Sequence, residues 1–163
     1  MRKAEGINMM MWLINYIHAL VAAVLVGKVV LLSFVVAPIL AKNLEREPFG
    51  KVVRQLLPAY YVLGMVTAVV GLLAVGATMA LQGGSLSLLY TGGIWLIVLI
   101  AESYCHSPLT PESNAMRDQL KEQAERGTVD PELLAAWNRL HQRSVYLNSL
   151  VLLAGLCLVA LVR

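Results

Sequence analysis

The sequence has little charge and little cysteine. Of its 163 residues, 14% are charged and 58% are hydrophobic, whereas soluble domains contain about 45–50% apolar residues. Two cysteines exclude a disulfide-stapled secreted module, and the apolar excess excludes a disordered chain. A soluble domain of this size has too little interior to bury so much apolar surface. We therefore expect one integral membrane domain, covering residues 1–163.

Long runs with almost no charge predict the membrane-spanning helices. A helix of about 20 apolar residues crosses the hydrocarbon core of a bilayer. We expect such helices at 9–40, 58–81, 86–106 and 131–162, the first with a single formal charge at Lys28 and the third with one at Glu102. Helices joined in chain order in this way form an all-α, up-down four-helix bundle.

Basic residues gather in the two long connections, at 41–57 and 107–143. The opposite side has three, namely Arg2, Lys3 and Arg163. The positive-inside rule therefore places both connections in the cytoplasm and both termini outside, in a bacterial-type inner (plasma) membrane. Because orientation explains the basic residues, we do not expect nucleic-acid binding. These cytoplasmic basic residues are Lys42, Arg46, Lys51, Arg54, Arg117, Lys121, Arg126, Arg139 and Arg143.

The connection at 41–57 contains an amphipathic segment. After Pro48, apolar residues recur at helical spacing as far as Leu57, with Lys51 and Arg54 on the other face. We expect an interfacial amphipathic helix whose basic side, Lys51 and Arg54, meets anionic headgroups. Pro58 then marks the entry into the second span.

The connection at 107–143 is predicted to form a cytoplasmic helical hairpin. Thr110 is placed to cap a helix that begins at Pro111, and Gly127 is placed to end it. Asp130 is placed to cap the next helix, which begins at Pro131. Because no proline follows Pro131, this helix is expected to continue straight through the bilayer.

Small residues predict which helix faces meet, because transmembrane helices associate by close packing. The first two spans each carry such a ladder: Ala19, Ala23 and Gly27 in the first, and Gly64, Ala68 and Gly71 in the second. We expect these two faces to pack together.

Lys28 lies opposite the first-span ladder on a helical wheel, so we expect it to point away from the bundle. One interpretation is that its stem extends towards the cytoplasmic headgroups. The other is that its charge meets an acidic or carbonyl group of a partner. The second interpretation predicts a homo-oligomer, or a complex with a partner membrane subunit, through the Lys28 face.

Polar groups at membrane depth form the candidate functional site. With Arg117 or Arg143 as a counter-charge, they would suit a cation, a proton or a small polar ligand. The alternative is that they hold the helices in register by hydrogen bonding. We expect them to converge at the cytoplasmic ends of the third and fourth spans, and they are Glu102, His106, His141, Ser144 and Asn148.

Histidines raise the question of a cofactor. His18, His106 and His141 are candidate metal ligands, and paired histidines in a four-helix bundle can ligate haem. His18 lies towards the outer end of its span, away from the other two, so we expect a hydrogen-bonded packing histidine. No cofactor is predicted, although haem b or copper stays open as an alternative.

Ordered blocks along nearly the whole chain resemble one known family. They are His18, SFVVAP at 33–38, FG at 49–50, LPAYY at 57–61, PLT at 108–110, MRD at 116–118, LH at 140–141, Ser144 and Asn148. In this order they resemble the transmembrane protein 205-like family of small four-helix membrane proteins. A Gly-rich or Trp-containing stretch that members often carry in the first helix reads VLVGK at 24–28 here. The resemblance implies the fold and the membrane location, and it supplies no reaction.

These observations favour a non-enzymatic polytopic membrane protein. We expect an accessory or solute- or metal-handling role in an oligomer or larger complex. One alternative is a membrane redox protein that binds haem or copper. Another is a small cation or proton transporter that uses Glu102 and His141, although the sequence shows no obvious inverted repeat. The chain also lacks a Gly-rich phosphate loop and a Gly-x-Ser-x-Gly elbow.

Overall fold

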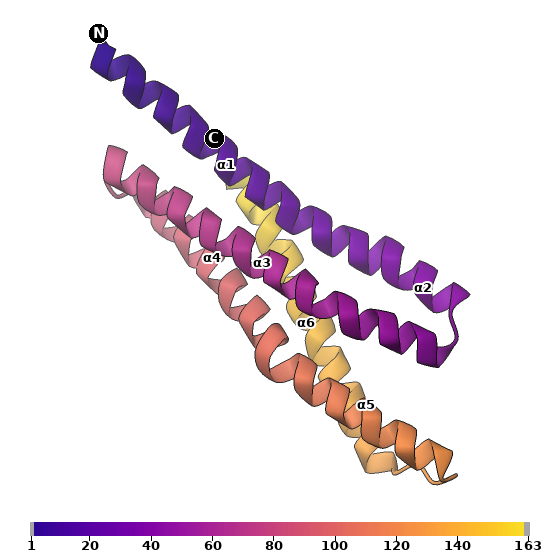
Figure 1. Ribbon diagram of the computed structural model, residues 1–163. Coiled ribbons are helices and arrows are strands. Elements are labelled where there is room, and N and C mark those ends of the chain that lie inside the picture. Colours follow the sequence, from indigo (N-terminus) through magenta and orange to yellow (C-terminus); the bar gives the residue numbers. More distant parts are fainter. Residues whose placement is uncertain (1, 162–163) are drawn as a thin grey trace.

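The protein is a bundle of long helices (Figure 1). The computed structural model describes residues 2–161, and every element in that range is helical. Four of its helices are long and apolar enough to cross a membrane, at Glu5–Asn43, Glu47–Gln82, Leu86–Glu125 and Pro131–Leu161. The predicted all-α, four-helix membrane fold is confirmed. The elements are α1 (Arg2–Val30), η1 (Leu31–Val36), α2 (Ala37–Asn43), α3 (Arg46–Gln82), α4 (Leu86–Tyr104), η2 (Cys105–Leu109), α5 (Thr110–Glu125) and α6 (Pro131–Leu161).

The helix α3 lies at the centre of the packing. It contacts both α1 and α4, while α6 packs against α1 and α4. A tight turn joins α3 to α4, and Gly83 adopts φ 85° there, a conformation that favours glycine. Ser85 then caps α4 by accepting a hydrogen bond from the backbone N–H of Leu88 at 3.3 Å.

Two spans pass through prolines by means of short π-helical stretches, η1 and η2. Pro38 lies just after η1, and Pro108 lies inside η2. The wider π turn accommodates a residue that has no N–H and whose ring crowds the preceding turn. As a result, helix is continuous from α1 into α2 and from α4 into α5.

The two predicted caps of the hairpin have different outcomes. The cap at Thr110 is wrong, because η2 runs directly into α5 and the Thr110 hydroxyl donates back to the carbonyl of Cys105 at 2.6 Å. The cap at Asp130 is confirmed, since its carboxylate accepts from the backbone N–H of Glu132 at 2.8 Å. The α6 helix then continues without a break to Leu161, as predicted.

The α3 helix also passes through Pro58 without a break. The predicted helix before Pro58 is present, but the predicted boundary at Pro58 is wrong, because this segment forms the first turns of α3. The segment is also tied to α5. Arg54 Nη2 donates to Asp118 Oδ1 at 2.6 Å, and Arg117 Nη1 donates to the carbonyl of Gly50 at 3.2 Å. Contact of Lys51 and Arg54 with headgroups stays a prediction.

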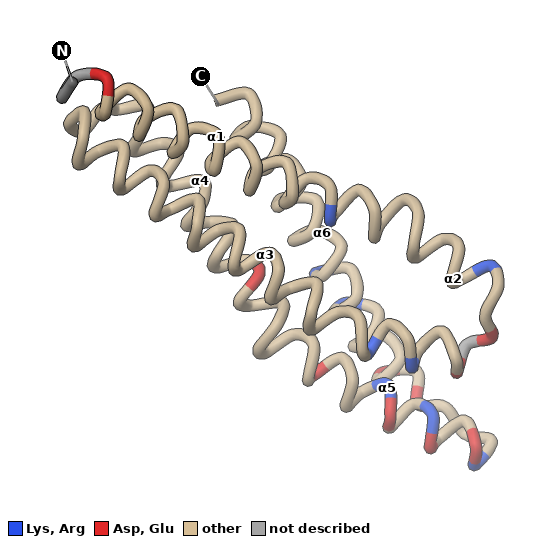
Figure 2. The backbone as a smooth tube through the Cα atoms, turned by 45° about the horizontal axis from the view of Figure 1, so that its top comes forward, with Lys and Arg blue, Asp and Glu red and all other residues tan. Residues whose placement is uncertain are grey.

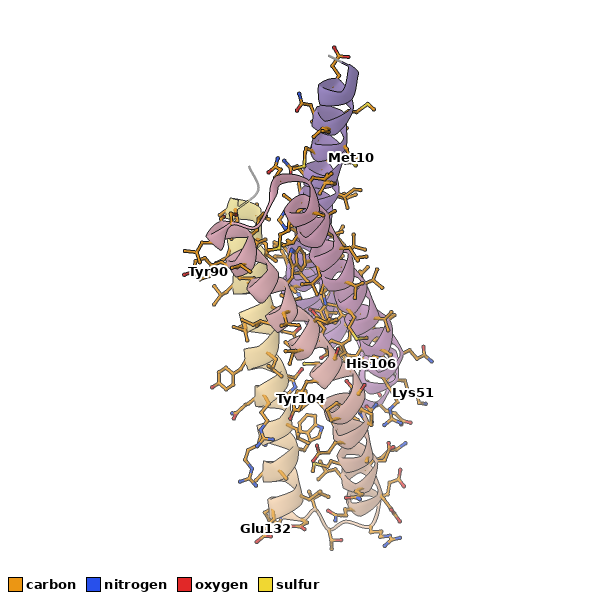
Figure 3. The ribbon with its side chains drawn as sticks, turned by 90° about the vertical axis from the view of Figure 1, so that its left-hand side faces the viewer. Met10, Lys51, Tyr90, Tyr104, His106 and Glu132 are labelled. Carbon is orange, nitrogen blue, oxygen red and sulfur yellow. The ribbon has the colours of Figure 1, made fainter. Side chains whose placement is uncertain are left out.

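Charged residues gather at one end of the molecule, where α2, α5 and the start of α3 lie (Figure 2). The two termini lie towards the other end. Figure 3 shows the side chains along the same axis, with Met10 near one end of the molecule and Glu132 near the other. Tyr90 lies in the first half of α4, and Tyr104 is its last residue. Arg163 and the side chains of Arg2 and Lys3 lie outside the part that the structure describes.

The packing face of α1 differs from the predicted one. Ala23 and Gly27 are exposed, and nothing lies within 4 Å of the position that a Cβ of Gly27 would take. The buried face instead carries Ala22, Leu25 and Val29, each no more than 2% exposed. The predicted meeting of the two small-residue faces is therefore wrong. The small ladder of α3 instead lies against long side chains, since a Cβ on Gly64 would meet Lys28 of α1 and Glu102 of α4.

Candidate functional site

Lys28 points into the bundle and forms an ion pair with Glu102. Its Nζ lies 2.6 Å from Oε1 of Glu102, and the two side chains are 4% and 1% exposed. The ammonium also donates to the carbonyl of Tyr60 at 3.3 Å and lies 3.8 Å from the centre of the Tyr60 ring. Both sequence interpretations of Lys28, extension to headgroups and contact with a partner, are thereby overturned. The charge that α1 carries into the membrane is neutralised by the charge that α4 carries.

A glycine of α3 makes room for this pair. A Cβ on Gly64 would overlap both Nζ of Lys28 and the carboxyl group of Glu102. The two long side chains therefore meet directly beside the α3 backbone, where any larger residue would push them apart. Gly64 is therefore buried by the side chains of Lys28 and Glu102 and not by the small residues of α1.

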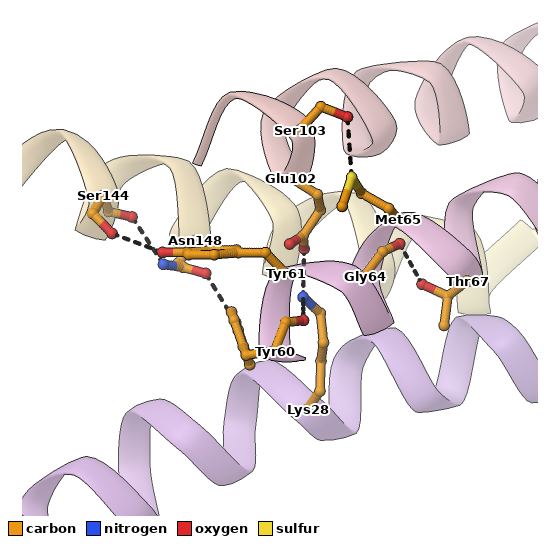
Figure 4. A network of polar contacts seen from close by, with 10 residues as sticks. All are labelled: Lys28, Tyr60, Tyr61, Gly64, Met65, Thr67, Glu102, Ser103, Ser144 and Asn148. Carbon is orange, nitrogen blue, oxygen red and sulfur yellow. Dashed lines mark hydrogen bonds and ion pairs between the residues drawn. The ribbon is translucent and has the colours of Figure 1, made fainter. Parts of the chain in front are cut away.

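Tyr60 connects the pair to polar residues of α6, and Tyr61 beside it contacts the same helix (Figure 4). The hydroxyl of Tyr60 donates to Oδ1 of Asn148 at 2.8 Å, and the hydroxyl of Tyr61 lies 3.2 Å from Oγ of Ser144. Asn148 in turn donates to the carbonyl of Ser144 at 3.0 Å. The three helices α1, α3 and α6 are thus linked through one polar network that begins at Lys28.

A cavity of about 730 Å³ adjoins this network. Tyr61, Ser144 and Asn148 form its polar wall on the side of the ion pair, and Arg117 of α5 and Trp137 of α6 line it at the charged end of the molecule. Its remaining walls are mostly apolar and come from η1, α2 and the first turns of α3; they include Leu32, Phe34, Leu40, Val53 and Leu57. This shape, apolar along the sides with a few polar groups, is typical of a small-molecule site.

Three side chains from α5 and α6 form a column in the cavity wall. The Trp137 ring stacks on the His141 ring, with centroids 5.7 Å apart and an interplanar angle of 10°. The Arg117 guanidinium carbon lies 5.9 Å from the centre of the Trp137 ring. Burial and the neighbouring Arg54 lower the pKa of Arg117, but an arginine keeps its charge at any ordinary pH.

The predicted site residues thus divide between two places. Ser144, Asn148, His141 and Arg117 all line the cavity, whereas Glu102 lies beside it in the ion pair. Arg117 is not the counter-charge of Glu102, because its guanidinium is held by Gly50 and Lys28 occupies that role.

The other predicted residues of the site lie apart from Glu102. His106 lies 3.5 Å from the hydroxyl of Ser107, and the buried face of the helix continues instead through Cys105 and Leu109. Arg143 is exposed. The expected convergence of both histidines on Glu102 is therefore wrong.

His18 has the packing role that its position predicts. Its Nε2 accepts a hydrogen bond from the indole N–H of the fully buried Trp95 at 2.9 Å. This contact occupies the lone pair that Nε2 would offer to a metal. Among the described residues, no group of three or more His, Cys, Asp or Glu side chains is placed to hold a metal ion. Cys105 and Cys157 are both free thiols.

Sequence reasoning missed Tyr60, Tyr61 and Trp137 as members of the site and the role of Lys28 in it. The signal for Lys28 is present, because two opposite charges in separate apolar spans are expected to find each other. For the aromatic residues, the sequence offers no comparable signal.

The fold and the site define a polytopic four-helix membrane protein with one ion pair buried between its spans. Residues 20–122 match the model of a family described as a domain of unknown function (DUF4149). Because the match covers more than half of the chain, the protein belongs to this family. The matched region contains Lys28, Gly64, Glu102 and Arg117 and ends before α6. Among curated proteins and among solved structures, nothing matches.

Proposed function

We propose that this protein is a non-enzymatic, solute-handling membrane protein that binds an amphipathic molecule in its cavity. The observation that carries this proposal is the cavity itself, about 730 Å³ in volume, which lies between the transmembrane bundle and the cytoplasmic hairpin. A volume in the range of about 300–1,000 Å³ with apolar walls and a few polar groups is characteristic of ligand sites.

The surroundings of the cavity support a binding role. The Lys28–Glu102 pair and the Tyr60–Asn148 hydrogen bond fix α1, α3, α4 and α6 relative to one another beside it. A site on packed helices is held more firmly than one on loops. The polar network thus serves to position the cavity walls, which combines the two sequence interpretations of the polar residues.

A cavity-filling substitution tests the proposal. Ser113 lines the cavity from α5 and is half-buried, so Ser113→Trp should occupy the space, whereas Gln119→Trp on the exposed face of α5 should not. Native mass spectrometry of the purified protein would measure the binding of palmitoyl-oleoyl phosphatidylglycerol and phosphatidylcholine. We expect Ser113→Trp to lower the binding of at least one lipid and Gln119→Trp to leave it unchanged. Equal binding by both variants would contradict the proposal.

A second candidate function is movement of a proton or cation through Glu102. One observation favours it: Oε2 of Glu102 is buried and makes no hydrogen bond within the described part of the chain. His141 is not part of this candidate, because it lies on Trp137 away from Glu102. Proteoliposomes that contain a pH-sensitive dye would show faster proton flux than empty ones, and Glu102→Gln would remove the difference. Identical flux in empty liposomes would exclude this function.

Self-association or membership of a larger complex is also part of the proposal, although no longer through Lys28. The exposed Ala23 and Gly27 support it, since small residues allow close helix approach in lipid. The mass of the protein in detergent, measured by light scattering, tests it. A monomer at every concentration would count against assembly with a second copy.

A further inference from the structure

The charged groups in the cavity wall are cationic. Arg117 lines the cavity, and none of its described lining residues is an aspartate or a glutamate. Arg117 takes part in no ion pair among the described residues, because the nearby Asp118 pairs with Arg54. A guanidinium without a carboxylate partner, partly removed from water, is complementary to an anion.

The structure holds Arg117 in place through a glycine. Gly50 is buried, and a Cβ there would come within 2.9 Å of Nη1 of Arg117. The guanidinium therefore lies against the α3 backbone and donates to the carbonyl of Gly50 at 3.2 Å. This single contact leaves most of its five N–H groups for other acceptors.

Trp137 supplies a second unpaired donor in the same wall. Its indole nitrogen is buried and has no hydrogen-bond partner among the described residues. Buried donors in folded proteins are paired in the great majority of cases, so such a group calls for an acceptor. Arg117 lies over the same ring, with its guanidinium carbon 5.9 Å from the ring centre.

The cavity opens sideways onto the apolar surface. Phe34 and Val145 line the cavity while being 67% and 49% exposed, so the opening lies between η1 and α6. The exposed large apolar residues of α6 within the predicted span run from Val145 to Val159, which places Leu152 near the middle of the apolar belt. Leu152 also lines the cavity.

The length of the cavity fits one leaflet of a bilayer. Along a helix at 1.5 Å per residue, Trp137 lies about 22 Å from Leu152. Half of a bilayer of about 40–45 Å, headgroups included, has nearly the same thickness. The cavity thus extends from the middle of the membrane to the level of the headgroups.

We propose that the occupant of the cavity is an anionic phospholipid of the surrounding membrane. Its phosphate would accept hydrogen bonds from Arg117, and its acyl chains would leave through the opening beside Phe34. This inference rests on the proposed binding function and names the ligand of that site.

The test compares two lipids that have the same acyl chains. Native mass spectrometry would titrate the purified protein with palmitoyl-oleoyl phosphatidylglycerol or with the zwitterionic phosphatidylcholine. We expect phosphatidylglycerol to bind about tenfold more tightly or better, because both lipids offer a phosphate but the choline cation of phosphatidylcholine would lie beside the Arg117 guanidinium and be repelled by it. Glycerol 3-phosphate should not compete at the same concentration, whereas equal competition would indicate a free phosphate compound as the ligand and overturn the lipid proposal.

Matched variants assign the preference to the cavity. Arg117→Gln should abolish it and Arg117→Lys should retain part of it, while Arg126→Gln should leave it intact because Arg126 pairs with Glu122 on the surface of the same helix.

Two outcomes separate this inference from the function on which it rests. If both lipids bind equally and Ser113→Trp blocks both, the cavity binds amphiphiles without a charge preference and the inference is wrong. If Ser113→Trp affects neither lipid, both the inference and the proposed function fail. Equal effects of Arg117→Gln and Arg126→Gln on phosphatidylglycerol binding would also contradict the inference. Such a result would mean that the lipid responds to the net charge of the protein and not to the cavity.

Discussion

At the scale of single residues, two charges in apolar spans determine how the bundle is assembled. Each alone would be costly in a membrane, and each would mark a functional hypothesis. Together Lys28 and Glu102 form one buried pair, with the side of Lys28 covered by the Tyr60 ring. The pair therefore explains both charges without invoking a partner molecule.

Removing one member of the pair should be more harmful than removing both. Glu102→Leu leaves the Lys28 ammonium buried and unpaired, for which we expect a loss of about 3–5 kcal/mol in stability, and Lys28→Met should behave similarly. The double variant should be more stable than either single variant. Unfolding in detergent measures all four proteins. Additive effects of the two substitutions would contradict a direct interaction.

The sequence predicts the burial of polar groups better than their partners. The sequence places Glu102, Ser144 and Asn148 in one polar region, whereas in the structure Glu102 is linked to Asn148 only through Lys28 and Tyr60. Lys28 was assigned to the wrong face because small residues were taken to mark the packing face of α1. In this helix Ala22, Leu25 and Val29 mark it instead, and large side chains fill the space between the helices.

At the scale of elements, glycines of α3 set how closely its neighbours approach. Gly64 lies against the ion pair, and a Cβ on Gly71 would overlap the Trp95 ring of α4. The small ladder of α3 was correctly predicted to be a packing face. The residues that cover this face were not predicted, because they are long side chains and not a second ladder of small residues. Helical periodicity identifies a face but not what covers it.

Two alanine substitutions on α3 should have opposite effects. Gly64→Ala forces Lys28 and Glu102 apart, so we expect a loss of about 1–3 kcal/mol in stability. Gly76→Ala lies on the exposed face with nothing within 4 Å, so it should be neutral or stabilising by up to about 1 kcal/mol. Thermal unfolding in detergent compares the two, and equal melting temperatures would show that Gly64 is not under steric constraint.

The helix boundaries show where local signals fail. Prolines at positions 38, 58 and 108 suggest helix breaks. However, α3 continues through Pro58, and π turns carry the helix past the other two prolines, from α1 into α2 and from α4 into α5. Tertiary contacts favour the continuity of α3. Arg54 of α3 donates to Asp118 of α5, and Arg117 of α5 donates to the carbonyl of Gly50 in α3. The turn before Leu86 and the cap at Asp130 were predictable because glycine, serine and aspartate act there on their own backbone.

At the scale of the whole molecule, the separation of charge predicts the orientation in the membrane. The charged end contains α5 and the first turns of α3 and α6, and surface pairs such as Lys121 with Glu47 at 3.0 Å tie it together. The hydrogen bonds from Lys121 and Lys51 lower the pKa of Glu47. Exposed pairs of this kind contribute little to stability.

Cysteine labelling tests the orientation. Gly84 and Thr128 are exposed in the loops at opposite ends, whereas the native Cys105 is buried. In a Cys157→Ser background, a membrane-impermeant maleimide should label Gly84→Cys in intact cells and Thr128→Cys only after permeabilisation. The reverse pattern would place the hairpin outside the cell.

The cavity is the feature that sequence reasoning did not foresee, because it arises where α2, α3, α5 and α6 diverge. A photoreactive amino acid at Ser113 measures its occupancy most directly, since this residue lines the cavity from α5. The matched position is Gln119, exposed on the same helix. On illumination in membranes, we predict that the probe at position 113 is crosslinked to phospholipid and the probe at position 119 is not. Equal capture at both positions, or none at position 113, would contradict a lipid-binding cavity.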